Sequence, residues 1–167
     1  MALNAYLKLT GAKQGDINGS VTQKGREGKI MVIAVNHEII SPRDVVSGQA
    51  TGKRQHKPFV ITKELDKSTP LLFSALVNNE NIVGWELQFF AAKTKSGAGA
   101  GVETNNYTVK LTDAFITDIK SIMLNNKDSE LAKFAPYEEI AFTYQKIEWT
   151  WVDGSITAMD DWESPIV

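Results

Sequence analysis

The feature that most constrains the fold is an alternation of apolar side chains over residues 137–151. Alternation with a period of two is typical of a β-strand, in which successive side chains point to opposite faces. The apolar positions are Ile140, Phe142 and Tyr144 in the first half and Ile147, Trp149 and Trp151 in the second. The first set is even and the second is odd, so a β-bulge or bend is predicted near Gln145 and Lys146. Such a bend lets one long strand serve two sheets or turn the corner of a barrel.

Most of the remaining chain is predicted to form short strands separated by polar turns. The segments rich in β-branched or alternating apolar residues are 3–9, 30–40, 59–63, 82–90, 107–111 and 115–123. Residues 41–57 contain Gly48 and Gly52 but little apolar material, which predicts an extended loop or a projecting hairpin. The glycine-rich residues 96–101 are expected to form a mobile hairpin tip. Many strands with one short helix favour a mainly β fold, either a barrel or a sandwich.

The single predicted helix runs from Pro70 to about Asn78 and is apolar on too many sides. Ser68 and Thr69 supply a hydroxyl cap ahead of the proline, and Asn78 can close the helix. Its apolar side chains are Leu71, Leu72, Phe73, Ala75, Leu76 and Val77. They cover an arc of roughly 240°, whereas a surface helix needs an apolar stripe of only about 100°. One sheet cannot cover that arc. Either a neighbouring subunit or a loop of the same chain must cover the second side, and the periodicity favours neither.

The composition limits the classes of partner. The 167 residues suit one domain spanning 1–167, and 18 Lys and Arg against 20 Asp and Glu give a formal net charge of -2. This balance argues against nucleic acid as the main partner, and no basic run suggests a membrane surface. No apolar run approaches the roughly 20 residues needed to span a bilayer, so membrane insertion is not expected. The N-terminus lacks the basic and apolar regions of a signal peptide.

No residues form a recognisable catalytic or cofactor site. Cysteine is absent, which excludes disulfides and thiolate chemistry. His37 and His56 are far apart and outside any metal-binding spacing, so both are predicted to be structural or surface histidines. Residues 48–53 fail the phosphate-loop pattern, because three residues rather than four separate the glycines and Arg54 follows the lysine. No enzymatic activity, metal or cofactor is therefore expected.

Paired acidic residues and clustered aromatic residues also have simple structural interpretations. The acidic pairs at 138–139 and 160–161 are adjacent, so on a strand their side chains point apart and cannot flank one bond. We expect them to be solvated charges at chain ends. Trp149 and Trp151 with Tyr144 could stack on a sugar, but their alternation with polar residues favours a buried core face.

Three separated motifs resemble those of one protein family. Residues 52–72 read GKRQHKPFVITKELDKSTPLL, residues 137–151 read YEEIAFTYQKIEWTW, and an early segment pairs 19–21 with 26–28. Together they resemble the haemolysin-coregulated protein family, Hcp, whose members form the inner tube of type VI secretion systems. The motifs follow the family's order, and the resemblance covers essentially the whole chain.

The resemblance implies a compact β-barrel of two sheets with one short flanking α-helix and an extended loop. It also implies hexameric rings that stack into a tube, which a contracting sheath expels behind a spike protein. Effector proteins can be carried and protected in the lumen. The chain would then be made in the cytoplasm and exported by the machine itself, in agreement with the missing signal peptide. No toxin extension is expected after the barrel.

The resemblance further suggests roles for particular segments. In the loop 41–57 the candidates for ring stacking are Arg43, Asp44, Lys53, Arg54 and His56, although some of them can simply be solvated. The helix and one sheet edge are expected to contact the neighbouring subunit, and the helix candidates are Leu71, Leu72, Phe73, Leu76 and Val77. The strand 30–40 would line the lumen, where Asn36 could contact cargo or simply face water.

Two other functions remain open alternatives to a self-assembling tube. One is a secreted β-sandwich module that binds a sugar or peptide, and the other is a hydrolase with an unrecognised site. A tube protein predicts rings whose interfaces each bury well over roughly 1,000 Å². A binding module predicts a monomer with an exposed aromatic patch, and a hydrolase predicts a pocket with perturbed carboxylates or histidines.

Overall fold

The computed structural model describes residues 2–92 and 102–163, which form three antiparallel sheets and one helix. The seven-stranded sheet contains β1 (Ala5–Gly11), β2 (Gly15–Ile17), β3 (Ile30–Val32), β8 (Ile82–Ala92), β9 (Glu103–Thr112), β12 (Lys146–Trp151) and β13 (Ile156–Asp161). The four-stranded sheet contains β4 (Ala34–Asn36), β7 (Phe59–Glu64), β10 (Phe115–Ile122) and β11 (Tyr137–Thr143). The remaining elements are β5 (Ile39–Ile40), β6 (Gln55–His56) and the helix α1 (Thr69–Val77). The tip predicted at 96–101 lies outside the described residues.

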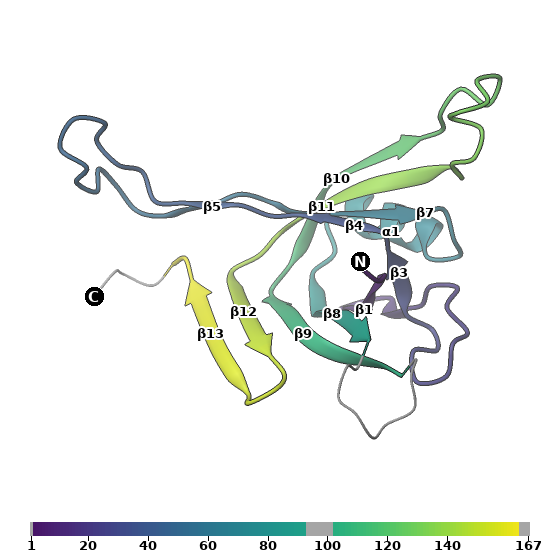
Figure 1. Cartoon of the computed structure of the whole chain (residues 1–167), viewed down its shortest axis with the longest axis horizontal. Coiled ribbons are helices and arrows are strands. Elements are labelled where there is room, and N and C mark those ends of the chain that lie inside the picture. The colour runs from purple at the N-terminus through teal and green to yellow at the C-terminus, as the bar shows by residue number, and fades with distance from the viewer. Residues whose placement is uncertain (1, 93–101, 164–167) are drawn as a thin grey trace.

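The two larger sheets face each other across a single core. The strand order is β13-β12-β9-β8-β1-β2 in the first sheet, where β3 also pairs with β1, and β10-β11-β7-β4 in the second. In Figure 1 the second sheet lies above the first. Register places apolar residues opposite one another, such as Leu7 against Leu87 and Ile61 against Ile140. Residues from both apolar faces belong to one buried core, so the two faces cover each other as the alternation in the sequence requires.

Besides the crossing through α1, from β7 to β8, the chain passes from one sheet to the other at three corners. It does so at Ile33, between β3 and β4, at Asp113, between β9 and β10, and at residues 144–145, between β11 and β12. The last corner confirms the bend predicted from the change of phase. A single bridge between Ile82 and Ala114 joins the sheets elsewhere, but within the described ranges their hydrogen-bond ladders stay separate. The predicted mainly β fold of two sheets is confirmed, and the barrel is open rather than closed.

The core is filled from both sheets and from one side of α1. Its largest fully buried apolar side chains are Leu7, Leu9, Ile17, Ile30, Ile61, Leu72, Ile82, Leu87, Ile140, Phe142 and Ile147. Trp85 packs edge-on between Phe59 and Phe142, with ring centroids 5.0 and 5.6 Å apart. Trp149 packs against this core, as predicted. The same prediction was wrong for Trp151, which is 46% exposed because β12 continues beyond the covering sheet.

The helix forms where it was predicted, but its cap differs. Pro70 lies in the first turn, and the backbone N–H of Asn78 donates to the Ser74 carbonyl at the C-terminal end. Ser68 occupies the N-cap position without capping, because its hydroxyl donates to the carboxylate of Asp66 instead. A hydrogen bond to an ionised carboxylate is stronger than one between neutral groups, so the hydroxyl donates to Asp66 and does not cap the helix. The predicted hydroxyl cap was therefore wrong.

Residues 39–56 form a hairpin that leaves the body of the molecule. β5 pairs with β6, and a bridge between Arg43 and Ala50 continues the pairing toward the tip. In Figure 1 this hairpin extends far to the left of the two sheets. The projecting hairpin predicted for 41–57 is therefore confirmed. The single strand predicted for 30–40 is instead three short strands, β3, β4 and β5, because the chain changes sheets within it.

Candidate functional site

A chain of hydrogen bonds fixes the base of the projecting hairpin. The hydroxyl of Tyr144 lies 2.7 Å from Nε2 of His37 and 2.8 Å from Nδ1 of His56. On its other side, Nε2 of His56 lies 2.7 Å from a carboxylate oxygen of Asp160. We call these four residues the hairpin-base chain. They join the start of the hairpin, its end, the corner between β11 and β12, and the strand β13.

The two histidines were predicted to be structural or surface residues, and the structure shows that both have a structural role at one shared hydroxyl. Antiparallel pairing of β5 with β6 places His56 opposite Ile39, two residues after His37. Both rings then reach the same corner of the sheet, where they meet Tyr144. Such a meeting depends on strand register far from either residue, so no local spacing in the sequence could have indicated it.

The ring-stacking candidates divide into two groups. Arg54 pairs with the carboxylate of Asp160 and donates to the backbone carbonyl of Asp161 at 2.7 Å. The side chain of His56 is only 2% exposed. These two residues therefore hold the hairpin to its own chain. The residues nearer the tip, Arg43 and Lys53, are exposed to solvent.

The hairpin tip presents an apolar pair that the sequence reasoning missed. Val45 and Val46 are 100% and 96% exposed. The exposed residue Asp44 shapes this tip, because its carboxylate accepts hydrogen bonds from the backbone N–H groups of Val46 and Ser47. Two adjacent β-branched residues within an otherwise polar loop were the available signal.

The helix α1 is divided between the core and the surface. Leu72 is fully buried within its own chain, and Leu76 packs partly against the core. Three apolar side chains face outward, and we call them the helix flank: Leu71 and Phe73, each 37% exposed, and Val77, 76% exposed. The chain itself thus covers one side of the wide apolar arc and leaves the other uncovered. Leu72 is accordingly a core residue with no surface to offer a neighbour.

A second uncovered apolar surface lies on β13, the edge strand of the larger sheet. Trp151 pairs with Ile156, and Trp149 pairs with Ala158, so these side chains continue the face that carries buried Ile147. Trp151, Ile156 and Ala158, which we call the β13 flank, are all exposed, Ile156 to 68%. In Figure 1 β13 lies at the left of the body and α1 at the right. The two flanks are therefore on opposite sides.

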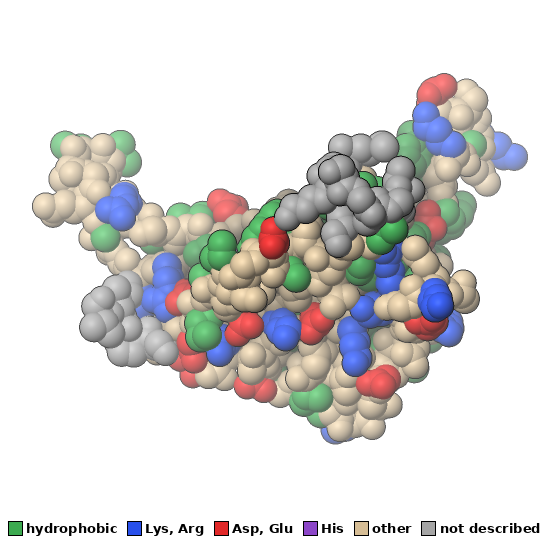
Figure 2. All heavy atoms as spheres, turned by 60° about the horizontal axis from the view of Figure 1, so that its bottom comes forward, with side chains coloured by type: hydrophobic (Ala, Val, Ile, Leu, Met, Phe, Trp, Pro, Cys, Tyr) green, Lys and Arg blue, Asp and Glu red, His purple; other side chains and the backbone are tan. Residues whose placement is uncertain are grey.

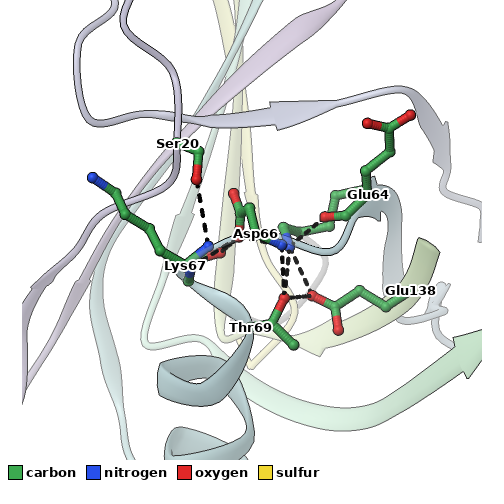
Figure 3. A network of polar contacts seen from close by, with 8 residues as sticks. Ser20, Glu64, Asp66, Lys67, Thr69 and Glu138 are labelled. Carbon is green, nitrogen blue, oxygen red and sulfur yellow. Dashed lines mark hydrogen bonds and ion pairs between the residues drawn. The ribbon is translucent and has the colours of Figure 1, made fainter. Parts of the chain in front are cut away.

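A buried polar cluster holds the start of α1 to the four-stranded sheet (Figure 3). Nζ of Lys63 lies 2.7 Å from Glu138 and 2.9 Å from Asp66, and the hydroxyl of Thr69 donates to Glu138 at 2.9 Å. We call these four residues the α1 cluster. Lys63 and Glu138 are fully buried. Although burial acts to raise the pKa of the Asp66 carboxyl, hydrogen bonds from Ser68 and Lys63 lower it.

Two of the acidic residues expected to be solvated are not. Glu138 lies inside the α1 cluster, and Asp160 accepts hydrogen bonds from His56 and Arg54. The pKa of Asp160 is lowered, chiefly by the hydrogen bond from the Arg54 guanidinium. Their interpretation as solvated charges was wrong because their cationic partners come from distant strands.

The described residues offer little room for chemistry at the hairpin base. The cavity beside His56, Tyr144 and Trp162 measures about 10 Å³, which is too small for a substrate. Within residues 2–92 and 102–163 no group of three or more His, Cys, Asp or Glu could hold a metal ion. Among the same residues no helix has the length and apolar character needed to cross a membrane. The titratable groups are therefore tied to each other rather than presented to a ligand.

The surface carries its charges in mixed sign. Lys8, Glu86 and Lys110 share a shallow depression on the outer side of the larger sheet, and Lys110 pairs with Glu86 at 3.5 Å. On the face drawn in Figure 2, basic and acidic side chains are interspersed. That face offers no stripe of positive charge for a nucleic-acid backbone.

Comparison with known proteins decides the family. The family described as "Type VI secretion system effector, Hcp" matches residues 6–151. The chain belongs to the Hcp family. A curated relative, the "Major exported protein" of Pseudomonas aeruginosa, is 43% identical over 175 residues, which cover 99% of each chain.

Solved Hcp structures agree with this assignment. One described as "Crystal structure of Hcp protein" has a TM-score of 0.86 and 32% identity, and the match covers 97% of this chain and 99% of that one. The "Secreted protein Hcp3 from Pseudomonas aeruginosa" has a TM-score of 0.74 and 36% identity, with coverage of 96% and 99%. The resemblance found in the sequence is confirmed. The chain is a tube protein of a type VI secretion system.

Proposed function

We propose that this Hcp chain closes into hexameric rings by placing the helix flank of one copy against the β13 flank of the next. The observation that carries the proposal is the pair of unlike, uncovered apolar surfaces on opposite sides of one subunit (Figure 1). A contact between two different surfaces is heterologous, and it generates a ring when the rotation between copies closes. A pair of identical surfaces would give a dimer instead.

The free energy of such a contact is favourable on both sides. Val77 and Ile156 are 76% and 68% exposed, and full burial of such a side chain contributes about 1.5–3 kcal/mol. The outer edge of β13 also offers backbone groups that no other described strand pairs with. Leu71, Phe73 and Trp151 would extend the buried surface toward the area of a stable interface.

The hairpin is suited to contact the next ring in a stack. It extends beyond the body, and its tip carries the exposed pair Val45 and Val46 beside Arg43, Asp44 and Lys53. These tip residues are the proposed stacking contacts. Arg54 and His56 would act from the base, by fixing the direction in which the hairpin points.

The remaining roles follow from a stacked tube. β4 is exposed along its length, and we assign Asn36 on this strand to the lumen, where it would contact carried effector proteins. The single-domain subunit would be made in the cytoplasm and exported together with a spike protein by sheath contraction. This agrees with the name of the Pseudomonas aeruginosa relative, the major exported protein.

Electron microscopy of the purified protein tests the proposal. Rings about one subunit thick, with a mass of six chains by light scattering, are expected. Val77→Asp and Ile156→Asp should each abolish rings, because each buries a charge in the contact. Met123→Asp is the matched control, since Met123 is 69% exposed but belongs to neither flank. A monodisperse wild-type monomer at high concentration would contradict the proposal and favour a binding module.

A further inference from the structure

The hairpin-base chain has a direction that is set by its charged end. Arg54 pairs with Asp160, and this pairing keeps the pKa of the carboxyl below its ordinary value, so Asp160 is an acceptor. Nε2 of His56 must then carry a hydrogen and donate it. In the neutral ring the other nitrogen, Nδ1, is an acceptor and takes the hydrogen of the Tyr144 hydroxyl. The Tyr144 oxygen in turn accepts from Nε2 of His37.

This arrangement can accept one additional proton but not two. If His56 becomes an imidazolium, its Nδ1 donates to Tyr144, and the tyrosine hydroxyl turns toward His37, which accepts as the other tautomer. If His37 is protonated as well, both rings donate to the same oxygen. The hydroxyl hydrogen of Tyr144 then has no acceptor within the chain, and two cations face each other across it. Burial raises the pKa of Tyr144, so losing that hydrogen does not relieve the conflict.

We propose that the hairpin-base chain is a pH-sensitive anchor, which fixes the projecting hairpin near neutral pH and releases it when both imidazoles are protonated. The inference rests on the proposed function only in its consequence, which is that acid weakens ring stacking. The rings themselves should persist, because neither flank contains a histidine.

The groups around the two rings support this assignment. Asp160 and Arg54 face His56 from β13 and from the hairpin, and Arg54 also donates to the backbone carbonyl of Asp161. The exposed pair of Glu38 and Lys57, 2.7 Å apart, flanks both rings along the chain. The other neighbours, Phe59 and Trp162, carry no charge.

Protonation of His37 is the second step, and its surroundings disfavour the charged form of the ring. Burial, and then the charge of His56, lower the pKa of His37. The unfolded state therefore binds more protons than the folded state near the ordinary histidine pKa of about 6.5. Stability from this group is complete above that pH and is lost as the pH falls below it. Asp160, whose pKa is lowered, remains ionised over the same range.

Hydrogen exchange of the full chain tests the anchor directly. Rates corrected for the intrinsic effect of pH are compared at pH 7.5 and pH 5.0 for peptides covering residues 38–57. The backbone N–H of Lys57, which donates to the Glu38 carbonyl at 3.0 Å, reports on the hairpin base. Protection there should fall by about tenfold or more in acid. Peptides from α1 serve as the internal reference and should change little.

Two variants separate the anchor from a general acid effect. Tyr144→Phe keeps the ring but removes the hydroxyl, so hairpin protection should be low at both pH values. His37→Gln leaves one imidazole, so protection should lose its pH dependence. Circular dichroism confirms that each variant is folded. Equal wild-type protection at both pH values, or an unchanged pH response in Tyr144→Phe, would overturn the proposal.

The consequence for assembly is measured separately, as tube length in electron micrographs at the two pH values. Shorter tubes with intact rings in acid are expected. A released hairpin with unchanged tubes would contradict the stacking role of the hairpin while leaving the anchor in place. If no rings form at either pH, the proposed function fails, and the exchange data still decide whether the anchor exists.

Discussion

The α1 cluster and the hairpin-base chain both tie one element to the sheets through charged side chains, but they differ in burial. Lys63 and Glu138 have no exposed surface, whereas the carboxylate of Asp160 in the hairpin-base chain is 24% exposed. The first joins a lysine to carboxylates, and the second contains two imidazoles, the side-chain type whose unperturbed charge change lies nearest to neutral pH. A fully buried lysine–carboxylate pair holds α1, whereas the hairpin is held through imidazoles, a side-chain type whose charge changes with pH in the ordinary range.

The difference matches what each element is proposed to do. The helix supplies part of a ring contact and must keep its place in every subunit. The hairpin is proposed to contact another ring, and an attachment that responds to pH would allow that contact to be released. The buried cluster also carries the larger desolvation free energy of the two, because Oε2 of Glu138 has no hydrogen-bond partner among the described residues.

The largest expected effect comes from breaking the α1 cluster. Lys63→Met removes the cation paired with Glu138 and should lower the free energy of unfolding by about 3–5 kcal/mol, because it leaves an uncompensated buried carboxylate. Urea denaturation measures this change. The double variant Lys63→Met with Glu138→Leu should recover most of the loss. A double variant no more stable than the single one would show that the ions hold α1 by more than their mutual charge.

The two sides of α1 give the next largest effect. Leu72→Ala should cost about 2–5 kcal/mol, because the side chain is fully buried. Val77→Ala, on the exposed side, should change the stability of dissociated subunits by no more than about 0.5 kcal/mol. Denaturation under conditions where rings are dissociated compares them. Equal costs would mean that Val77 is sheltered within its own chain and is unavailable to a neighbour.

Removal of the Tyr144 hydroxyl should have an intermediate effect that depends on pH. Tyr144→Phe loses hydrogen bonds to both histidines and should cost about 1–3 kcal/mol at pH 7.5. The cost should shrink at pH 5, where the wild-type chain is already disrupted. Paired urea titrations at the two pH values measure the difference. A cost that is the same at both would mean that the hydroxyl contributes independently of histidine protonation.

The smallest effect is expected at the exposed pair beside the chain. Glu38 and Lys57 are each about half exposed, so Lys57→Gln should cost between roughly 0 and 1 kcal/mol. The residual effect should disappear in high salt, since exposed charges are screened. A larger, salt-independent loss would place Lys57 among the residues that anchor the hairpin.

Local signals in the sequence were enough for most of the fold. The change of phase between Tyr144 and Ile147 located a sheet corner, and the proline at position 70 located the start of α1. The sequence did not predict which distant segments come into contact. Neither the meeting of His37 with His56 at one hydroxyl nor the pairing of Lys63 with Glu138 follows from spacing, because both depend on strand register.

The surfaces proposed for assembly show the same division. The wide apolar arc of α1 was visible in the sequence, but it could not decide that Leu72 belongs to the core whereas Phe73 and Val77 lie at the surface. The β13 flank was missed because no strand was predicted over residues 156–161, and because alternation alone gave Trp151 the pattern of a buried face. Only the length of the covering sheet decides that their face is uncovered.

A mixing experiment tests most directly whether two unlike flanks build the ring. Val77→Asp keeps an intact β13 flank, and Ile156→Asp keeps an intact helix flank. Each variant alone should be monomeric, and an equimolar mixture should contain one intact contact per pair. Light scattering of the mixture should therefore give the mass of two chains and no larger species. Full rings from either variant alone or from the mixture, or a mixture that remains monomeric at high concentration, would contradict the account.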